Sequence, residues 1–245
     1  MPGEENNFNK IAQSYSNNFH PVVKFNPAKE RLLAFDFTGK NIELRQIDLQ
    51  DIEAFSHYIS NQLQIHNAKF GCGGYNELRS LYERSDLFDN NLTNEKKLVG
   101  IEEPRRLHLG IDIWGRAGSD VFAPLDGTVH SFGYNSQLGD YGATIILSHR
   151  LENISFFTLY GHLSLKDIKN LSEGNIIRAG QKFANFGNIV ENGCWPPHLH
   201  FQIIKNISSF RGDYPGVCKL SESAQYLENS PDPDLILGMR QFIVG

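Results

Sequence analysis

The chain has 245 residues, of which 40% are hydrophobic and 21% are charged, so it resembles an ordinary globular protein with a sizeable core. Its formal net charge is -5 and its basic residues are scattered, which gives no support for a nucleic-acid binder with a basic stripe. No apolar run approaches the roughly 18 residues of a membrane span, so no transmembrane helix is predicted.

The N-terminus is polar and acidic, and it lacks a basic stretch followed by an apolar one, so no secretory signal is predicted. Cys72, Cys194 and Cys218 have no C-x-x-C spacing, which argues against a disulfide framework and against a cysteine zinc site. We therefore expect a cytoplasmic protein. A periplasmic or extracellular location would require another export route or a trimmed leader.

The first third of the chain mixes helical and strand patterns. In chain order we expect a loosely ordered lead-in over residues 1–20, a hairpin of strands over 32–38 and 41–46, and helices over 48–67 and 76–88. Asp48 is expected to cap the first helix. The polar run over 89–97 is the best candidate for a domain boundary.

The pattern changes to short strands after residue 98. The expected strands cover residues 107–113, 127–132, 143–149, 155–163 and 198–204, with glycine and proline between them and no useful helical period. A short helix is expected over 221–227. We predict an α+β N-terminal extension over 1–97, a mainly β domain over 98–210, and a C-terminal extension over 211–245 packed on that domain.

The segment Leu107–Ile113 alternates strictly between apolar and other side chains. Successive side chains of a strand point to opposite faces, so His108 and Asp112 share one face and the apolar set enters the core. Gly110 lies between the two polar residues on that face. The segment therefore predicts a histidine and a carboxylate that converge across an open space.

The segment His198–Ile203 shows the same alternation. His198, His200 and Gln202 fall on one face, and the apolar residues between them fall on the other. Two histidines separated by one residue on a strand therefore approach the same space.

A third histidine lies in the segment Thr158–Leu163. By alternation, Thr158, Tyr160 and His162 are expected to share one face of this strand. A histidine is again carried on a strand that is otherwise packed in the core.

These residue types suit a catalytic zinc, which takes three nitrogen or oxygen ligands and keeps an open position for water. Two histidines and one carboxylate leave the ion enough positive charge to acidify that water. Spacing pairs His108 with Asp112 but leaves open which of His198 and His200 joins them. The surplus histidines would transfer protons or stabilise an oxyanion.

The same segments closely resemble the lysostaphin/LytM-type zinc metallopeptidases. The match covers roughly residues 99–204 and comprises, in family order, HLGID at 108–112, FAPLDGTV at 122–129, GDYGATIILSH at 139–149, LYGHLS at 159–164, IRAGQ at 177–181 and PPHLHFQI at 196–203. The resemblance implies that His108, Asp112 and His200 hold one Zn²⁺ per chain. It also implies that His162 and His198 are catalytic histidines that do not bind the metal.

The resemblance further implies a mainly β catalytic domain of antiparallel sheets, with the family's duplicated hybrid motif, beside the α+β N-terminal region. The implied function is hydrolysis of amide bonds in peptidoglycan or peptidoglycan-like peptides through a zinc-activated water. Tyr141, near a family-typical position, and Arg106, suited to hold a carboxylate, are expected to contact substrate. The expected partner is a peptide or peptidoglycan fragment, with no nucleic acid and no membrane; the oligomeric state is open.

Two other functions compete with this interpretation. The absence of an export signal favours a zinc hydrolase that acts on a cytoplasmic peptide or another amide. A non-enzymatic binding module on the same fold is the other alternative. It is less favoured because all five site residues are retained: His108, Asp112, His162, His198 and His200.

Overall fold

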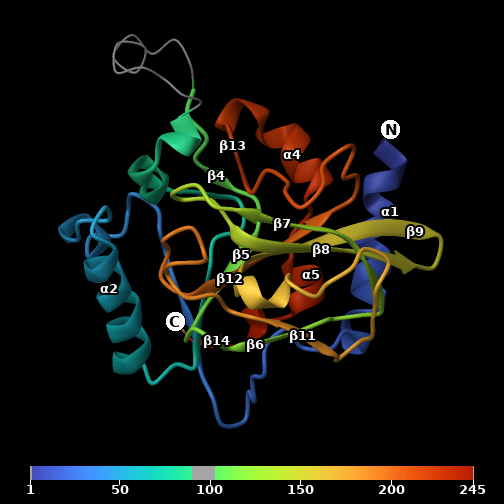
Figure 1. The fold of residues 1–245 in the computed structure, drawn as a ribbon, viewed down its shortest axis with the longest axis horizontal. Coiled ribbons are helices and arrows are strands. Elements are labelled where there is room, and N and C mark those ends of the chain that lie inside the picture. Colours follow the sequence, from blue (N-terminus) through green and yellow to red (C-terminus); the bar gives the residue numbers. More distant parts are fainter. Residues whose placement is uncertain (1, 90–102, 245) are drawn as a thin grey trace.

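The computed structural model describes residues 2–89 and 103–244, and a large twisted sheet runs through the centre of this part (Figure 1). Its nine strands are, in spatial order, β10 (Ile176–Ile177), β7 (Gly127–Asn135), β8 (Gly142–Leu151), β9 (Ile154–Leu163), β12 (His198–Ile204), β5 (Ile111–Trp114), β2 (Phe70–Gly73), β1 (Leu32–Ala34) and β14 (Ile243–Val244). Neighbouring strands are antiparallel except at β1, which runs parallel to β2 and to β14. The predicted mainly antiparallel β architecture is confirmed.

Smaller elements surround this sheet. One pair joins β6 (Asp120–Phe122) to β11 (Lys182–Asn185), and a three-stranded sheet has the order β13 (Val217–Cys218), β4 (Leu107–His108), β3 (Glu77–Leu78). The α-helices of the described residues are α1 (Pro2–Ser14), α2 (Ile52–Ile65), α4 (Ser223–Asn229) and α5 (Asp234–Leu237). In Figure 1, α1 and α2 lie at opposite sides of the molecule. Among the described helices, none combines the length and apolarity that crossing a membrane requires.

The alternation predicted for β12 is confirmed, and it separates the core from the site. Leu199, Phe201 and Ile203 lie in the main hydrophobic core, and all residues of the strand are buried. His198 and His200 lie on the opposite face. β12 is central in the sheet, so β9 and β5 pair with its two edges and leave neither edge exposed.

The segment Leu107–Ile113 is two strands, so the prediction of one continuous strand was wrong. β4 belongs to the small sheet and β5 to the large one, and the chain bends between them. At the bend the amide of Leu109 donates to the carbonyl of Gly216, 2.9 Å away. This contact extends the pairing of β4 with the C-terminal segment by one residue.

The lead-in over residues 1–20 is more ordered than predicted, since α1 occupies most of it. Phe8 and Ala12 are buried at a spacing of four residues, and Ile11 and Tyr15 pack beside them on the main core. This stripe has helical spacing, so the sequence contained the signal.

The predicted hairpin over 32–46 was wrong, because only Leu32–Ala34 is a strand. Past it, local side chains satisfy the backbone: the amide of Thr38 donates to Asp36 and that of Leu44 donates to Asn41. Asp and Asn compete for backbone hydrogen bonds in this way, and they favour turns over ladders.

The first predicted helix is confirmed with a shorter extent, and the second was wrong. Asp51, rather than Asp48, caps α2 by accepting from the amides of Glu53 and Ala54. Residues 76–88 form β3 and two 3₁₀ turns, because β3 pairs with β4. The later predicted helix over 221–227 corresponds to α4, which begins and ends two residues further on.

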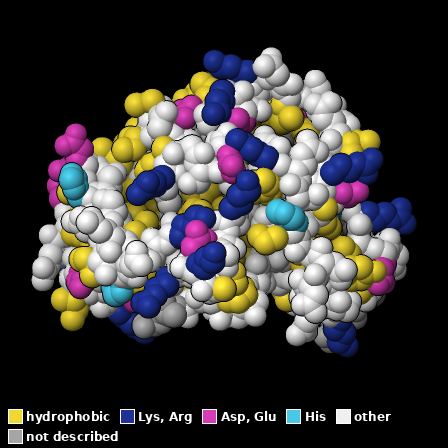
Figure 2. Space-filling view, turned by 90° about the horizontal axis from the view of Figure 1, so that it is seen from below, with side chains coloured by type: hydrophobic (Ala, Val, Ile, Leu, Met, Phe, Trp, Pro, Cys, Tyr) yellow, Lys and Arg dark blue, Asp and Glu magenta, His cyan; other side chains and the backbone are white. Residues whose placement is uncertain are grey.

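Strands from all three predicted segments join the same large sheet. β1 and β2 come from the N-terminal segment, β14 comes from the C-terminal one, and the rest come from the middle. The predicted boundary over 89–97 lies almost wholly outside the described residues. One face of the molecule shows basic, acidic and hydrophobic side chains interspersed (Figure 2).

Candidate metal centre

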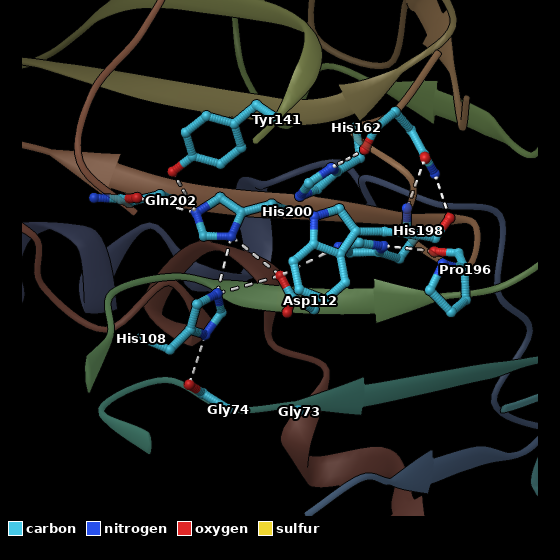
Figure 3. A network of polar contacts seen from close by, with 12 residues as sticks. Gly73, Gly74, His108, Asp112, Tyr141, His162, Pro196, His198, His200 and Gln202 are labelled. Atoms are coloured by element: carbon cyan, nitrogen blue, oxygen red, sulfur yellow. Dashed lines mark hydrogen bonds and ion pairs between the residues drawn. The ribbon is translucent and has the colours of Figure 1, made fainter. Parts of the chain in front are cut away.

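Three side chains from β4, β5 and β12 converge at the middle of the large sheet (Figure 3). His108 Nε2 lies 2.9 Å from His200 Nδ1 and 3.3 Å from Asp112 Oδ1, and the latter two atoms are 3.1 Å apart. All three residues are buried. Among the described residues, they form the group of histidine and carboxylate side chains able to hold a metal ion.

The outer nitrogen of each histidine contacts a fixed partner. The carbonyl of Gly74 can only accept, so His108 donates from Nδ1 at 2.7 Å and keeps a lone pair on Nε2. Gln202 donates its amide protons to Pro215 and Ser230, so its Oε1 accepts from His200 Nε2 at 3.0 Å. His200 Nδ1 therefore carries a lone pair, which faces His108 Nε2 and Asp112 Oδ1.

The charge of Asp112 is stabilised in a buried place. Burial opposes its ionisation, but His108, Arg79 and the hydrogen bonds around it outweigh burial and hold the pKa of this carboxyl well below its usual range. Burial, with Arg79, lowers the pKa of His108 to about 3. An ionised carboxylate and neutral imidazoles are the protonation states that bind metals.

The donor set fits Zn²⁺. Three lone pairs face one point with no proton between them, and such acceptors repel one another unless a cation lies there. Donors on a tetrahedron with bonds of about 2.0–2.1 Å are roughly 3.3 Å apart, and the observed separations of 2.9–3.3 Å are close to this. His108, Asp112 and His200 would therefore hold the ion.

His162 and His198 lie beside the three donors, with ring centroids 4.1 Å apart. Each donates Nδ1–H to a backbone carbonyl at 2.8 Å, His162 to Asn192 and His198 to Pro196 (Figure 3). His198 also stacks on Trp114, with centroids 4.0 Å apart. Burial lowers the pKa of His198 to about 4 and that of His162 well below its ordinary value. Both rings are therefore neutral and present Nε2 as an acceptor.

His162 does not share a face with Tyr160, so the alternation predicted for β9 was wrong at its end. Tyr160 packs in the main core against Phe201, its partner in the register of β12. His162 has a φ of 61°, a left-handed conformation that turns its ring to the metal face. A left-handed conformation is costly for a residue other than glycine, and such strain is found at functional sites.

The site opens into a pocket of about 120 Å³. Its walls combine all parts of the chain: Leu81, Tyr82, Leu87 and Phe88 from the N-terminal segment, the loop Gly139–Tyr141, and Asp213 to Val217 from the C-terminal segment. Tyr141 is in this wall, with its hydroxyl 3.4 Å from His200 Nε2. Arg106 pairs with Asp89 and is not among the lining residues. Substrate contact by these two residues stays a prediction.

Sequence reasoning did not assign the residues that orient the ligands. Gln202 lies on the polar face of β12 by the same alternation that placed His200, so its position was a usable signal. The carbonyl of Gly74 and the guanidinium of Arg79 come from the N-terminal segment. No local pattern connects them to residues 30 or more positions away.

Comparison with known proteins agrees with these motifs. Residues 106–211 match the model of peptidase family M23. A protein of Haemophilus influenzae named an uncharacterized metalloprotease is 36% identical over 98 residues, which are 40% of this chain and 18% of that protein. These similarities agree with the predicted resemblance to LytM-type M23 peptidases over this segment, and the Zn²⁺ prediction agrees with both the matched family and the donor set.

Solved structures of peptidases are also similar to part of the chain. A zinc-containing peptidase from Vibrio cholerae is 27% identical, with 40% of this chain and 27% of that chain covered and a TM-score of 0.33. The catalytic domain of the antimicrobial peptidase lysostaphin from Staphylococcus simulans is 26% identical, with 51% of this chain and 81% of that chain covered and a TM-score of 0.35. The chain thus spans 18% of the Haemophilus protein and 27% of the Vibrio one.

Proposed function

We propose that this chain, with its M23 domain, is a zinc metallopeptidase that hydrolyses amide bonds of peptidoglycan or peptidoglycan-like peptides. The observation that carries the proposal is the convergence of three metal donors with two neutral histidines on one buried face. Bound zinc would supply Lewis-acid activation of water and of the scissile carbonyl. His108, Asp112 and His200 are proposed to hold it.

His162 and His198 are proposed to move the proton. Each has its Nδ1–H engaged by a backbone carbonyl, so the free Nε2 can accept a proton from the attacking water. When the C–N bond breaks, the same proton goes to the leaving amine. The two rings are so close that two imidazolium charges would repel each other strongly. Only one of the two histidines is therefore proposed to be protonated at a time.

The pocket of about 120 Å³ beside the proposed metal centre supports a peptide substrate there. The walls from the N-terminal and C-terminal segments lie outside the part of the chain that matches the family. Substrate choice is therefore proposed to depend on them.

The test combines defined muropeptides and cytosolic peptides, with and without chelator, read by mass spectrometry. We expect about one zinc per chain and loss of hydrolysis when chelator removes it. His108→Ala should lose zinc because a ligand is gone. His198→Ala should keep zinc and lose turnover by roughly 10²–10⁴-fold, the range for a proton-transfer group.

Distinct outcomes separate the alternatives. A folded protein that binds no zinc contradicts the proposal. Cleavage of a cytosolic amide with muropeptides left intact supports the second hydrolase hypothesis. Zinc binding without hydrolysis of any peptide supports a binding module.

A further inference from the structure

The N-terminal segment reaches the proposed metal centre through a tight turn after β2. The carbonyl of Gly74 accepts from His108, and the carbonyl of Gly73 accepts from Arg79 Nη2 at 3.2 Å. Both glycines and Arg79 lie outside residues 106–211, the part that matches the peptidase family. Two of the three proposed ligands thus contact a segment that the family match does not include.

Arg79 is the centre of this contact. Its side chain is buried, yet each of its three guanidinium nitrogens contacts an acceptor. Nη1 donates to Asp112 Oδ2 at 2.5 Å and to the Tyr82 hydroxyl at 3.2 Å, while Nε donates to Glu77 Oε2 at 2.6 Å. Glu77 in turn accepts from the amide of Phe37 at 3.1 Å, so it is itself held in place.

This arrangement divides the two oxygens of Asp112. Oδ2 is held by Arg79, whereas Oδ1 faces His108 and His200 at 3.3 and 3.1 Å. A carboxylate held in this way offers one oxygen to a metal rather than two. A bound zinc would then keep a position for water or substrate, as a catalytic zinc site requires.

The turn leaves no room for a side chain at Gly74. Its φ is 89°, and a Cβ there would lie 1.9 Å from Arg79 Nη2 and 2.4 Å from Glu77 Oε2. The glycine allows the backbone to approach the guanidinium closely while its carbonyl points to His108. The turn and the arginine therefore form one unit.

We propose that Arg79 is a positioning residue that fixes Asp112 as a one-oxygen ligand and so links the N-terminal segment to the metal centre. This inference rests on the proposed zinc site. It implies that residues 70–82 belong to the working centre rather than to a detachable extension.

The test compares Arg79→Met, Arg79→Lys and a control, Phe37→Leu, in the full chain. Met keeps much of the length of the side chain and removes its hydrogen-bond donors. Lys keeps the positive charge but loses the planar set of donors that the guanidinium presents. Phe37 is buried under the same guanidinium, 5.2 Å from its ring, so Phe37→Leu loosens the same segment without touching Asp112. Zinc affinity is measured by competition with a chelator, and cobalt-substituted protein gives a visible ligand-field spectrum.

We expect Arg79→Met to bind zinc about 10–100-fold more weakly, as on loss of other partners of metal ligands. Arg79→Lys should be intermediate, and the cobalt spectrum of both should change. Phe37→Leu should unfold at lower urea but keep the wild-type affinity and spectrum.

Two results would overturn the inference. One is wild-type zinc affinity and spectrum in Arg79→Met, or in Arg79→Lys if the Met variant does not fold. The other is an equal loss of affinity in Phe37→Leu, which would make the effect merely one of stability. A wild-type protein that binds no zinc contradicts the proposed function instead, so the two failures are distinguishable.

Discussion

Gly110 lies against His200, and its lack of a side chain leaves space for this proposed zinc ligand. A Cβ at this position would lie 2.4 Å from Cε1 and 2.6 Å from Nε2 of His200, and 2.9 Å from the carbonyl oxygen of Phe201. The φ of Gly110 is outside the left-handed region, so alanine adds no backbone strain. Gly110→Ala is therefore a nearly pure steric perturbation of one proposed ligand.

The size of the effect follows from these distances. Carbon atoms in contact are about 3.5–4.0 Å apart, so the imidazole of His200 would have to retreat by roughly 1 Å. The ring is already held at Nε2 by Tyr141 at 3.4 Å and by Gln202 at 3.0 Å, so it has little room. Metal–ligand distances tolerate only about 0.2 Å. We expect zinc binding to weaken by at least about 100-fold, or about 2.8 kcal/mol.

The assay is zinc competition with a chelator at pH 7.5, with urea unfolding of the metal-free protein measured alongside. Overpacking should lower the free energy of unfolding by about 1–3 kcal/mol. Gly39→Ala is the matched control, since a Cβ at Gly39 has no neighbour within 4 Å. It should leave zinc affinity unchanged. If Gly110→Ala is folded and binds zinc within threefold of wild type, the steric reasoning is refuted.

Two further predictions concern stability. His149 is buried between the carbonyl of Asp126 and the hydroxyl of Thr158, and burial lowers its pKa to about 4. The unfolded chain, with a pKa of about 6.5, binds the proton more readily, so this residue's contribution is complete above pH 6.5 and is lost as pH falls towards 4. Between pH 7.5 and 5 it should amount to about 2 kcal/mol. Urea unfolding of wild type and His149→Gln at both pH values measures it, and an equal loss in both proteins contradicts the assignment. At His162, with a φ of 61°, Gly should be better tolerated than Ala. We expect His162→Gly to be more stable than His162→Ala by about 1 kcal/mol in urea unfolding, because the left-handed conformation costs about 1–2 kcal/mol for a residue with a Cβ. The opposite order would show that the backbone relaxes in the variants.

The part of the fold that the sequence predicted well is the part where neighbouring residues carry the signal. Strict alternation placed β12 with its apolar residues in the core and its histidines opposite, since the period of a strand is local. In the N-terminal segment the same reasoning failed. Residues 76–88 became a short strand and 3₁₀ turns because Glu77 and Leu78 pair with β4, a partner far along the chain.

The sequence by itself determined which residue types could form the proposed metal centre. His108 and Asp112 are four residues apart, and His198 and His200 are two apart, so simple strand geometry brought each pair to one face. Strand geometry alone could not predict how far apart the two pairs lie in the folded protein. Donor separations near 3 Å arise because β12 pairs with β5 in the register that sets His200 opposite Asp112.

Only the tertiary structure decided what holds this centre in place. Arg79 reaches Asp112 across 33 residues, and the carbonyl of Gly74 reaches His108 across 34. The left-handed conformation of His162 occurs where the register of β9 against β8 shifts, and its amide donates to the carbonyl of Tyr141, a residue distant in sequence. Local periodicity reports which side of a strand a residue faces. Contacts between distant segments, which the folded chain alone brings together, determine where that side chain points and what charge it carries.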